Sequence, residues 1–183
     1  MNRVWMITGA GRGLGRAFAE EAVKNGDMVI ATVRKINDAD PLMKNENVLP
    51  VIMDVTKKEE VAAAIAAGIK KFGRIDVLIN NAGFGMSGAF EEVSDEELRT
   101  LMETNFFGVT NVTRAVLPVM RNQGSGMILT APLRQEPWDS SEAPHTVLPS
   151  MRLWDCGSAQ YGTGAFRNPG CFYPARFISD GFS

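Results

Sequence analysis

A glycine-rich turn between a short apolar run and a helical pattern is the feature that most limits how this chain can fold. Residues 8–15 read TGAGRGLG, after the apolar residues VWMI at 4–7. The glycines at 9, 13 and 15 lack the Cβ atoms that would block a tight turn and the close approach of backbone to a pyrophosphate. The helix that follows would direct unpaired N–H groups and its positive dipole end at such a ligand. The pattern predicts a phosphate-binding unit, with an ordinary strand-to-helix turn as the alternative.

Beyond this turn, short apolar runs alternate with helical patterns. The runs predicted to form buried parallel strands are 3–7, 28–33, 48–53, 76–79 and 127–129. Residues 56–59 and 94–97 each match a capping box, which opens a helix. A long helix that includes residues 98–117 is predicted to follow the second capping box. This alternation predicts an α/β fold with a Rossmann-like, doubly wound parallel sheet.

Four motifs then carry a resemblance to a known family. They are the glycine turn at 8–15, Asp54-Val55, the NNAG segment at 80–83 that follows an apolar strand, and Asn105 within a helix. In order and spacing they resemble the short-chain dehydrogenase/reductase family over about residues 3 to 130. We therefore expect residues 1–130 to form an NAD(P)-binding Rossmann-like domain. Residues 131–183 are expected to be an anomalous, irregular tail, so that the sheet is truncated after about its fifth strand.

The resemblance implies a set of cofactor-binding residues. They are Thr8, Gly9, Arg12, Gly13, Leu14, Gly15, Arg34, Asp54, Val55, Asn80, Ala82 and Gly83. It implies that Asp54 accepts a hydrogen bond from the adenine amino group while Val55 lies against the ring; the alternative is that Asp54 helps to cap the next helix. It also implies a catalytic role for Asn105, which would hold a water in a proton relay, and the alternative is a core asparagine with satisfied hydrogen bonds.

The residues after the second strand bear on the choice of cofactor. Family members that bind NAD usually carry an acid there for the ribose hydroxyls, and this chain has Val33 followed by Arg34. An acid would repel a 2′-phosphate, whereas arginine pairs with it through charge-assisted hydrogen bonds. Arg12 in the glycine turn would add a second positive charge. NADP is therefore favoured over NAD, unless both arginines are only solvated surface residues.

The family's chemistry is hydride transfer between a carbonyl and an alcohol, with a Tyr-x-x-x-Lys pair moving the proton. No lysine follows Lys71 in this sequence, so neither Tyr161 nor Tyr173 completes that pair. Residues 131–166 lack helical or alternating periodicity, which suggests a shifted reading frame, with a splice product, a pseudogene product or a deliberately altered chain as alternatives. The function predicted is thus an NADP(H)-dependent oxidoreductase of doubtful competence. The alternative is a non-catalytic truncated isoform or pseudoenzyme that binds nucleotide or pairs with an intact homologue.

Composition excludes several other classes. The 183 residues are 45% hydrophobic with a net charge of −2 and no long run of like charge, so neither nucleic-acid nor membrane binding is expected. No signal peptide or spanning segment is evident, and a cytoplasmic location is the expectation. The cysteines at 156 and 171 show no metal-site spacing, so no metal is predicted. The expected partners are a small carbonyl or alcohol substrate and, through helix 98–117, a homo- or hetero-oligomer.

Overall fold

The computed structural model describes residues 2–36, 40–86, 90–131 and 159–161. Its strands are β1 (Val4–Thr8), β2 (Met28–Val33), β3 (Val48–Ile52), β4 (Val77–Asn80), β5 (Gly126–Thr130) and β6 (Ala159–Tyr161). Its α-helices are α1 (Gly13–Lys24), α2 (Lys58–Phe72), α3 (Asp95–Met102) and α4 (Val109–Gln123). Short turns of other helix types are η1 (Leu42–Lys44), η2 (Phe90–Glu92) and the π-helical η3 (Glu103–Gly108).

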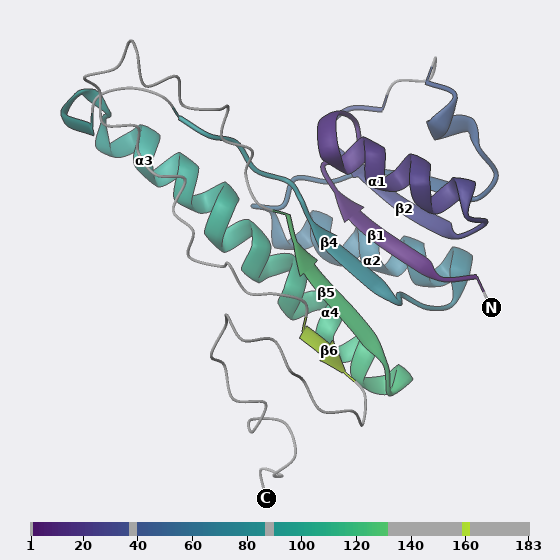
Figure 1. The fold of residues 1–183 in the computed structure, drawn as a ribbon. Helices are drawn as coiled ribbons and strands as arrows, with labels where there is room; N and C mark the ends of the chain where they lie inside the picture. Colours follow the sequence, from purple (N-terminus) through teal and green to yellow (C-terminus); the bar gives the residue numbers. More distant parts are fainter. Residues whose placement is uncertain (1, 37–39, 87–89, 132–158, 162–183) are drawn as a thin grey trace, which may run out of the picture.

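The strands form a single sheet in the order β3-β2-β1-β4-β5-β6 (Figure 1). The first five are parallel, with Ile7 opposite Ala31 on one side and Ile79 on the other. The chain crosses from the β3 edge back to β4 at the centre, so the strand order reverses between β1 and β4. Ligands of open α/β sheets bind at the carboxyl ends of the strands at such a switch point. The predicted doubly wound parallel sheet is therefore confirmed.

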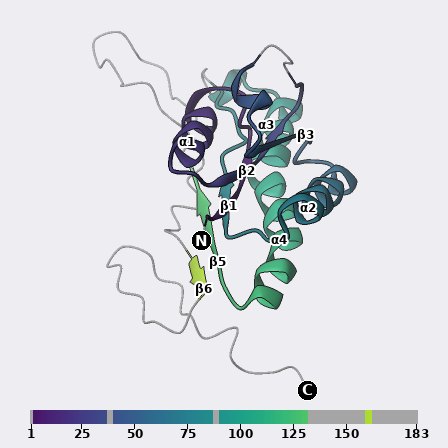
Figure 2. The ribbon, with the colours of Figure 1, turned by 90° about the vertical axis from the view of Figure 1, so that its right-hand side faces the viewer.

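Helices cover both faces of the sheet, which explains why its strands are apolar on both sides. Figure 2 shows α1 on one side of the strands and α2 with α4 on the other. One core cluster packs between the sheet and α1, around Ile7, Ala19 and Val29. The second packs against α2 and α4, around Ile30 and Leu78. In the described residues, no helix is both long and apolar enough to cross a membrane.

The sheet continues one strand beyond the expected truncation. Strand β6 pairs with β5 in the antiparallel direction, with Tyr161 opposite Gly126 and Ala159 opposite Ile128. Part of the outer edge of β5 is thereby hydrogen-bonded rather than exposed. Apart from Ala131, the other residues of the expected tail, among them Tyr173 and the two cysteines, lie outside the described residues, as does the segment in which the resemblance would place the Tyr-x-x-x-Lys pair.

The helix starts and windings differ from the sequence pattern in two places. The capping box at Ser94 is present, since Ser94 Oγ accepts from Glu97 N while the Glu97 carboxylate accepts from Ser94 N. The capping box predicted at Thr56 is wrong, because the Thr56 hydroxyl donates to Asp54 Oδ1 at 2.8 Å. The N-cap of α2 is the next residue, Lys57, and the helix begins at Lys58. The predicted single helix over 98–117 is divided into α3, η3 and α4.

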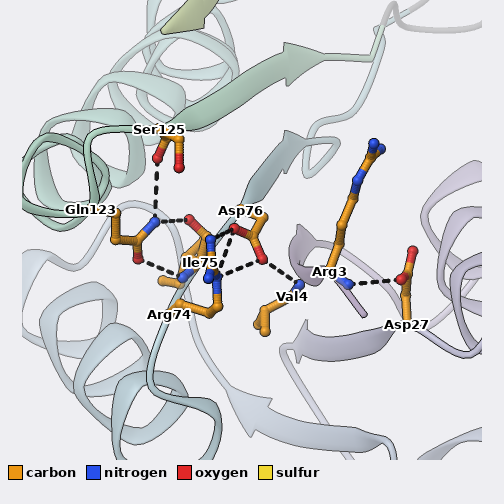
Figure 3. A network of polar contacts seen from close by, with 8 residues as sticks. All are labelled: Arg3, Val4, Asp27, Arg74, Ile75, Asp76, Gln123 and Ser125. Atoms are coloured by element: carbon orange, nitrogen blue, oxygen red, sulfur yellow. Dashed lines mark hydrogen bonds and ion pairs between the residues drawn. The ribbon is translucent and has the colours of Figure 1, made fainter. Parts of the chain in front are cut away.

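Polar contacts fix the amino ends of the central strands (Figure 3). Asp76 accepts from Val4 N at 2.9 Å and binds the Arg74 guanidinium, which ties the start of β4 to the start of β1. The Gln123 amide accepts from Ile75 N and donates to Ile75 O, both at 2.9 Å, which ties the end of α4 to the same point. These contacts hold the strands whose opposite ends form the candidate site.

Candidate functional site

A cleft of about 1330 Å³ opens at the carboxyl ends of β1, β2, β3 and β4, where the sheet topology predicts a ligand. The space exceeds that of an ordinary small-molecule pocket and suits an extended ligand. The predicted site residues that line it are Gly9, Arg12, Gly13, Leu14, Arg34, Asp54, Val55, Ala82 and Gly83. Thr8, Gly15, Asn80 and Asn105 are not in the lining, and each lies behind or beside it.

Thr8 joins the two central loops of the cleft. Its side chain is buried at the end of β1, and Oγ1 accepts hydrogen bonds from the backbone N–H groups of Asn81 and Ala82, both at 2.9 Å. The hydroxyl itself donates a hydrogen bond to Ile79 O at 3.4 Å. Thr8 thus fixes the start of the loop after β4 without touching the cleft.

Asn81, which is not among the predicted site residues, holds the glycine turn. Asn81 Nδ2 donates to Thr8 O at 2.9 Å and to Gly9 O at 3.2 Å, and Asn81 also lines the cleft. A Cβ built on Gly15 would overlap Asn81 Nδ2 and Gly9 O, so only glycine fits there. Gly9 has a positive φ of 69°, which disfavours any side chain. The second asparagine of the NNAG segment was the available signal for this contact.

The other asparagine of that segment points away from the cleft. Asn80 is buried at the end of β4, and its Nδ2 donates to Thr113 Oγ1 of α4 at 3.1 Å. Its buried Oδ1 has no hydrogen-bond partner among the described residues. Asn80 therefore joins the sheet to α4 and is not among the residues that line the cleft, so its predicted role in cofactor binding stays a prediction.

Asn105 lies in the π-helical η3 and binds the backbone of the loop after β4. Its Oδ1 accepts from Phe84 N at 3.1 Å and its Nδ2 donates to Phe84 O at 2.8 Å. Phe84 lines the cleft, so Asn105 fixes the wall on that side. Both polar atoms of the side chain have partners, and its catalytic role stays a prediction.

Asp54 lies at the opposite end of the cleft, directly after β3. Its Oδ1 accepts from Thr56 N at 2.9 Å and from Thr56 Oγ1 at 2.8 Å, while its own N–H donates to Glu60 of α2. These hydrogen bonds to Thr56, backbone first, hold the pKa of Asp54 below its usual range, and the charges of Lys57 and Arg34 act in the same direction. Its Oδ2 accepts no hydrogen bond from the described residues, and Asp54 is among the residues that line the cleft.

Positive side chains gather around the cleft. Arg12, Arg34, Lys35 and Arg99 line it, and none of them forms an ion pair with another described residue. Arg16, one turn further along α1, is by contrast bound by the carboxylate of Asp40. Unpaired cations at the edge of a cleft favour an anionic ligand.

The N-terminus of α1 adds a further site for an anion. Its N-cap residue, Arg12, makes no side-chain capping bond, and the first turn holds no acidic residue. The N–H groups at this end therefore lack the side-chain acceptor that Ser94 supplies to α3. Together with the cations, this arrangement suits phosphate groups. In the described ranges, no group of three or more His, Cys, Asp or Glu side chains could hold a metal ion.

Comparison with known proteins gives the same assignment for most of the chain. The family model described as short chain dehydrogenase matches residues 3–131. An oxidoreductase of Botryotinia fuckeliana is 47% identical over 131 residues, which is 70% of this chain and 48% of that protein. A 3-ketodihydrosphingosine reductase of Bacteroides thetaiotaomicron is 41% identical over 69% of this chain and 45% of its own length. The chain thus spans about half the length of these curated relatives.

One alignment continues past the family match. An uncharacterized oxidoreductase of Staphylococcus saprophyticus is 33% identical over 160 residues, covering 86% of this chain and 61% of that protein. Solved structures agree with the fold. A short-chain dehydrogenase of Streptomyces avermitilis matches with a TM-score of 0.67 and 43% identity over 71% of this chain and 49% of its own. A 3-ketoacyl-(acyl-carrier-protein) reductase of Brucella melitensis, solved with NADH, has a TM-score of 0.64 and 34% identity over 67% of this chain and 52% of its own.

Proposed function

Because the chain belongs to the short-chain dehydrogenase family, we propose that its cleft binds a nicotinamide dinucleotide, with NADP(H) preferred over NAD(H). The observation that carries the preference is the position of Arg34. It follows β2 at the cleft edge, forms no ion pair with a described residue, and lies near enough to Asp54 to lower its pKa. A guanidinium at this point is free to bind a 2′-phosphate through two hydrogen bonds.

The residues present fit such a cofactor along the length of the cleft. The glycine turn and the start of α1 would hold the pyrophosphate, since the N–H groups at this helix end lack a side-chain acceptor. Asp54 Oδ2 is a free acceptor for an adenine amino group, and Val55 offers an apolar wall beside it. The Brucella relative's NADH supports a nicotinamide dinucleotide, and the choice between NAD and NADP depends on this chain's own cations.

Titration with NADPH and NADH tests the proposal. Wild type should bind NADPH more tightly than NADH. Arg34→Ala should weaken NADPH binding by about 10-fold or more, because it removes charge-assisted hydrogen bonds to the 2′-phosphate. NADH affinity should change by less than about twofold, because NADH has no 2′-phosphate for Arg34 to bind. Lys70→Ala, which removes an exposed cation from α2, is the matched control and should leave both affinities unchanged. Equal losses for the two cofactors, or a wild type that prefers NADH, would refute the preference.

For the reaction, we propose hydride transfer between a carbonyl and an alcohol, the chemistry that the bound nicotinamide supplies. The described residues would hold the cofactor and exclude water from one side of it. Moving the accompanying proton requires an acid or base near the substrate oxygen. In this proposal Asn105 lies near the reacting end of the cofactor, where its hydrogen bonds to the Phe84 backbone fix one wall of the cleft.

One observation favours a second, non-catalytic function. No lysine follows Lys71 in the sequence, so the chain has no Tyr-x-x-x-Lys pair to transfer the proton. A protein of this kind would bind nucleotide without turnover, or pair with an intact homologue through helix 98–117. NADPH-dependent turnover that is abolished by Gly15→Trp would support the enzyme. Binding without turnover, or a stable complex with an intact homologue in sedimentation, would support the non-catalytic protein.

A further inference from the structure

Val55 is held in the cleft wall from behind by α4. Its side chain lines the cleft, and only 6% of the residue is exposed. Its carbonyl oxygen accepts a hydrogen bond from Asn111 Nδ2 at 3.1 Å. A Cβ built on Gly108 would lie 2.5 Å from Val55 Cγ2 and 3.1 Å from Val55 Cβ. The valine therefore occupies space that exists because residue 108 is glycine.

The winding of η3 brings these two contacts into register. The π-helical turn inserts one extra residue relative to an α-helix, which rotates everything after it by about 100°. Asn105 within the turn binds the loop after β4, at Phe84, and Asn111 beyond it binds the loop after β3, at Val55. The same helical segment thus fixes one wall at each end of the cleft.

We propose that Asn111 and Gly108 are positioning residues for the adenine half of the cofactor, acting through Val55. This inference rests on the proposed dinucleotide site. The other hydrogen bonds of the loop come from outside α4, since Glu60 of α2 holds Asp54 N and Lys57 N donates to Asp54 O. Asn111 supplies the hydrogen bond that sets how far Val55 stands from α4, and Gly108 supplies the room behind the side chain.

The two residues make different, separable predictions. Asn111→Ala frees the Val55 carbonyl, so the wall loses its anchor and moves. Gly108→Ala places a methyl group against a stiff β-branched side chain, and Val55 must shift toward the cleft. Alanine also favours the helix over glycine. The gain in helix propensity offsets part of the overpacking cost, so α4 should remain formed while the adenine wall is displaced. A loss of affinity confined to the adenine half is a result that a merely structural role for residue 108 would not produce.

Ligand fragments divide the site into halves for the test. The adenine half is represented by 2′,5′-ADP and the nicotinamide half by reduced nicotinamide mononucleotide, with NADPH as the whole ligand. Asn111→Ala should weaken 2′,5′-ADP and NADPH by about 3- to 10-fold, the value of one neutral hydrogen bond, and leave the mononucleotide within about twofold. Gly108→Ala should show the same selectivity. Thr110→Ala, whose hydroxyl bonds only within the helix to Phe106 O, is the matched control.

Two outcomes separate this inference from the proposed function. If wild type binds 2′,5′-ADP and both variants bind it equally well, or weaken both fragments alike, the positioning role is wrong and the dinucleotide site stands. If wild type binds neither 2′,5′-ADP nor NADPH, the proposed function fails. Amide hydrogen exchange then still tests the anchor without ligand. Asn111→Ala should speed exchange at Thr56 and Lys57 and leave Phe84 unchanged, and unchanged exchange at all three would overturn it.

Discussion

Replacing Thr8 by valine should weaken both the fold and the site. The two side chains have nearly the same shape, so the change removes a hydroxyl and little else. In the structure that hydroxyl oxygen is the acceptor for two backbone N–H groups, those of Asn81 and Ala82, at 2.9 Å each. Valine offers neither an acceptor nor room for a water, because residue 8 is only 1% exposed.

The magnitude follows from the two orphaned donors. A buried or partly buried donor that loses its partner costs roughly 1–3 kcal/mol, so the loss of two should lower the free energy of unfolding of Thr8→Val by about 2–6 kcal/mol. A domain of this size has about 5–15 kcal/mol in total, so the variant should fold with a reduced margin. The orphaned groups belong to the loop that lines the cleft, and NADPH affinity should fall with stability.

Urea unfolding and NADPH titration check this prediction, with Thr8→Ser as the matched control. Serine keeps the acceptor and loses only a methyl group, so it should be less destabilised than valine by about 1 kcal/mol or more. If Thr8→Val is as stable as Thr8→Ser and binds NADPH equally well, Thr8 is not the residue that joins the two loops.

Two further predictions concern the periphery of the site. Ser94→Ala should speed amide exchange at Glu97 by about fivefold, which corresponds to roughly 1 kcal/mol for a lost N-cap, and Ser94→Asp should restore the protection; unchanged exchange in the alanine variant would contradict the capping role. Hydrogen bonds from the Arg16 guanidinium, and then from Leu42 N, lower the pKa of Asp40 in the folded protein. The stability that they contribute is therefore complete above the ordinary aspartate pKa of about 3.9. It is lost as the pH falls through the lower pKa of the folded state. The difference in urea midpoint between wild type and Asp40→Asn should therefore shrink below about pH 4, and a difference independent of pH would contradict this.

The sheet was predictable because its signals are local. The strands are short apolar runs bounded by turns, and the glycine-rich pattern at 8–15 marks the turn between β1 and α1. The bounds of β2 are as predicted, and those of the other four predicted strands differ by at most one residue at either end, as in β1, which runs from Val4 to Thr8. Asp54 also lies just beyond the end of β3 as predicted, among the residues that line the cleft.

What the sequence could not predict depends on competition between contacts. The Thr-x-x-Glu pattern at 56–59 fails as a capping box because Asp54, two residues before Thr56, takes its hydroxyl and amide protons first. The π-helical turn follows from no periodic pattern, because residues 103–108 also fit a regular helix. Asn81, rather than Asn80, meets the glycine turn because successive residues at the end of a strand point to opposite sides.

The arrangement of contacts separates binding from chemistry in this chain. Several features at the cleft suit an anionic, extended ligand: the uncapped α1 terminus, the unpaired cations, and loops fixed by Thr8, Asn105 and Asn111. Two carboxylates, Glu96 and Glu103, line the same cleft. None of these groups belongs to a Tyr-x-x-x-Lys pair, since no lysine follows Lys71 in the sequence. Affinity for the cofactor and turnover should therefore respond to different parts of the sequence. Under the proposed function, changes to residues that line the cleft, such as Arg34→Ala, should alter the dissociation constant of NADPH, whereas turnover also needs a proton-transfer group such as the Tyr-x-x-x-Lys pair, which these residues do not include.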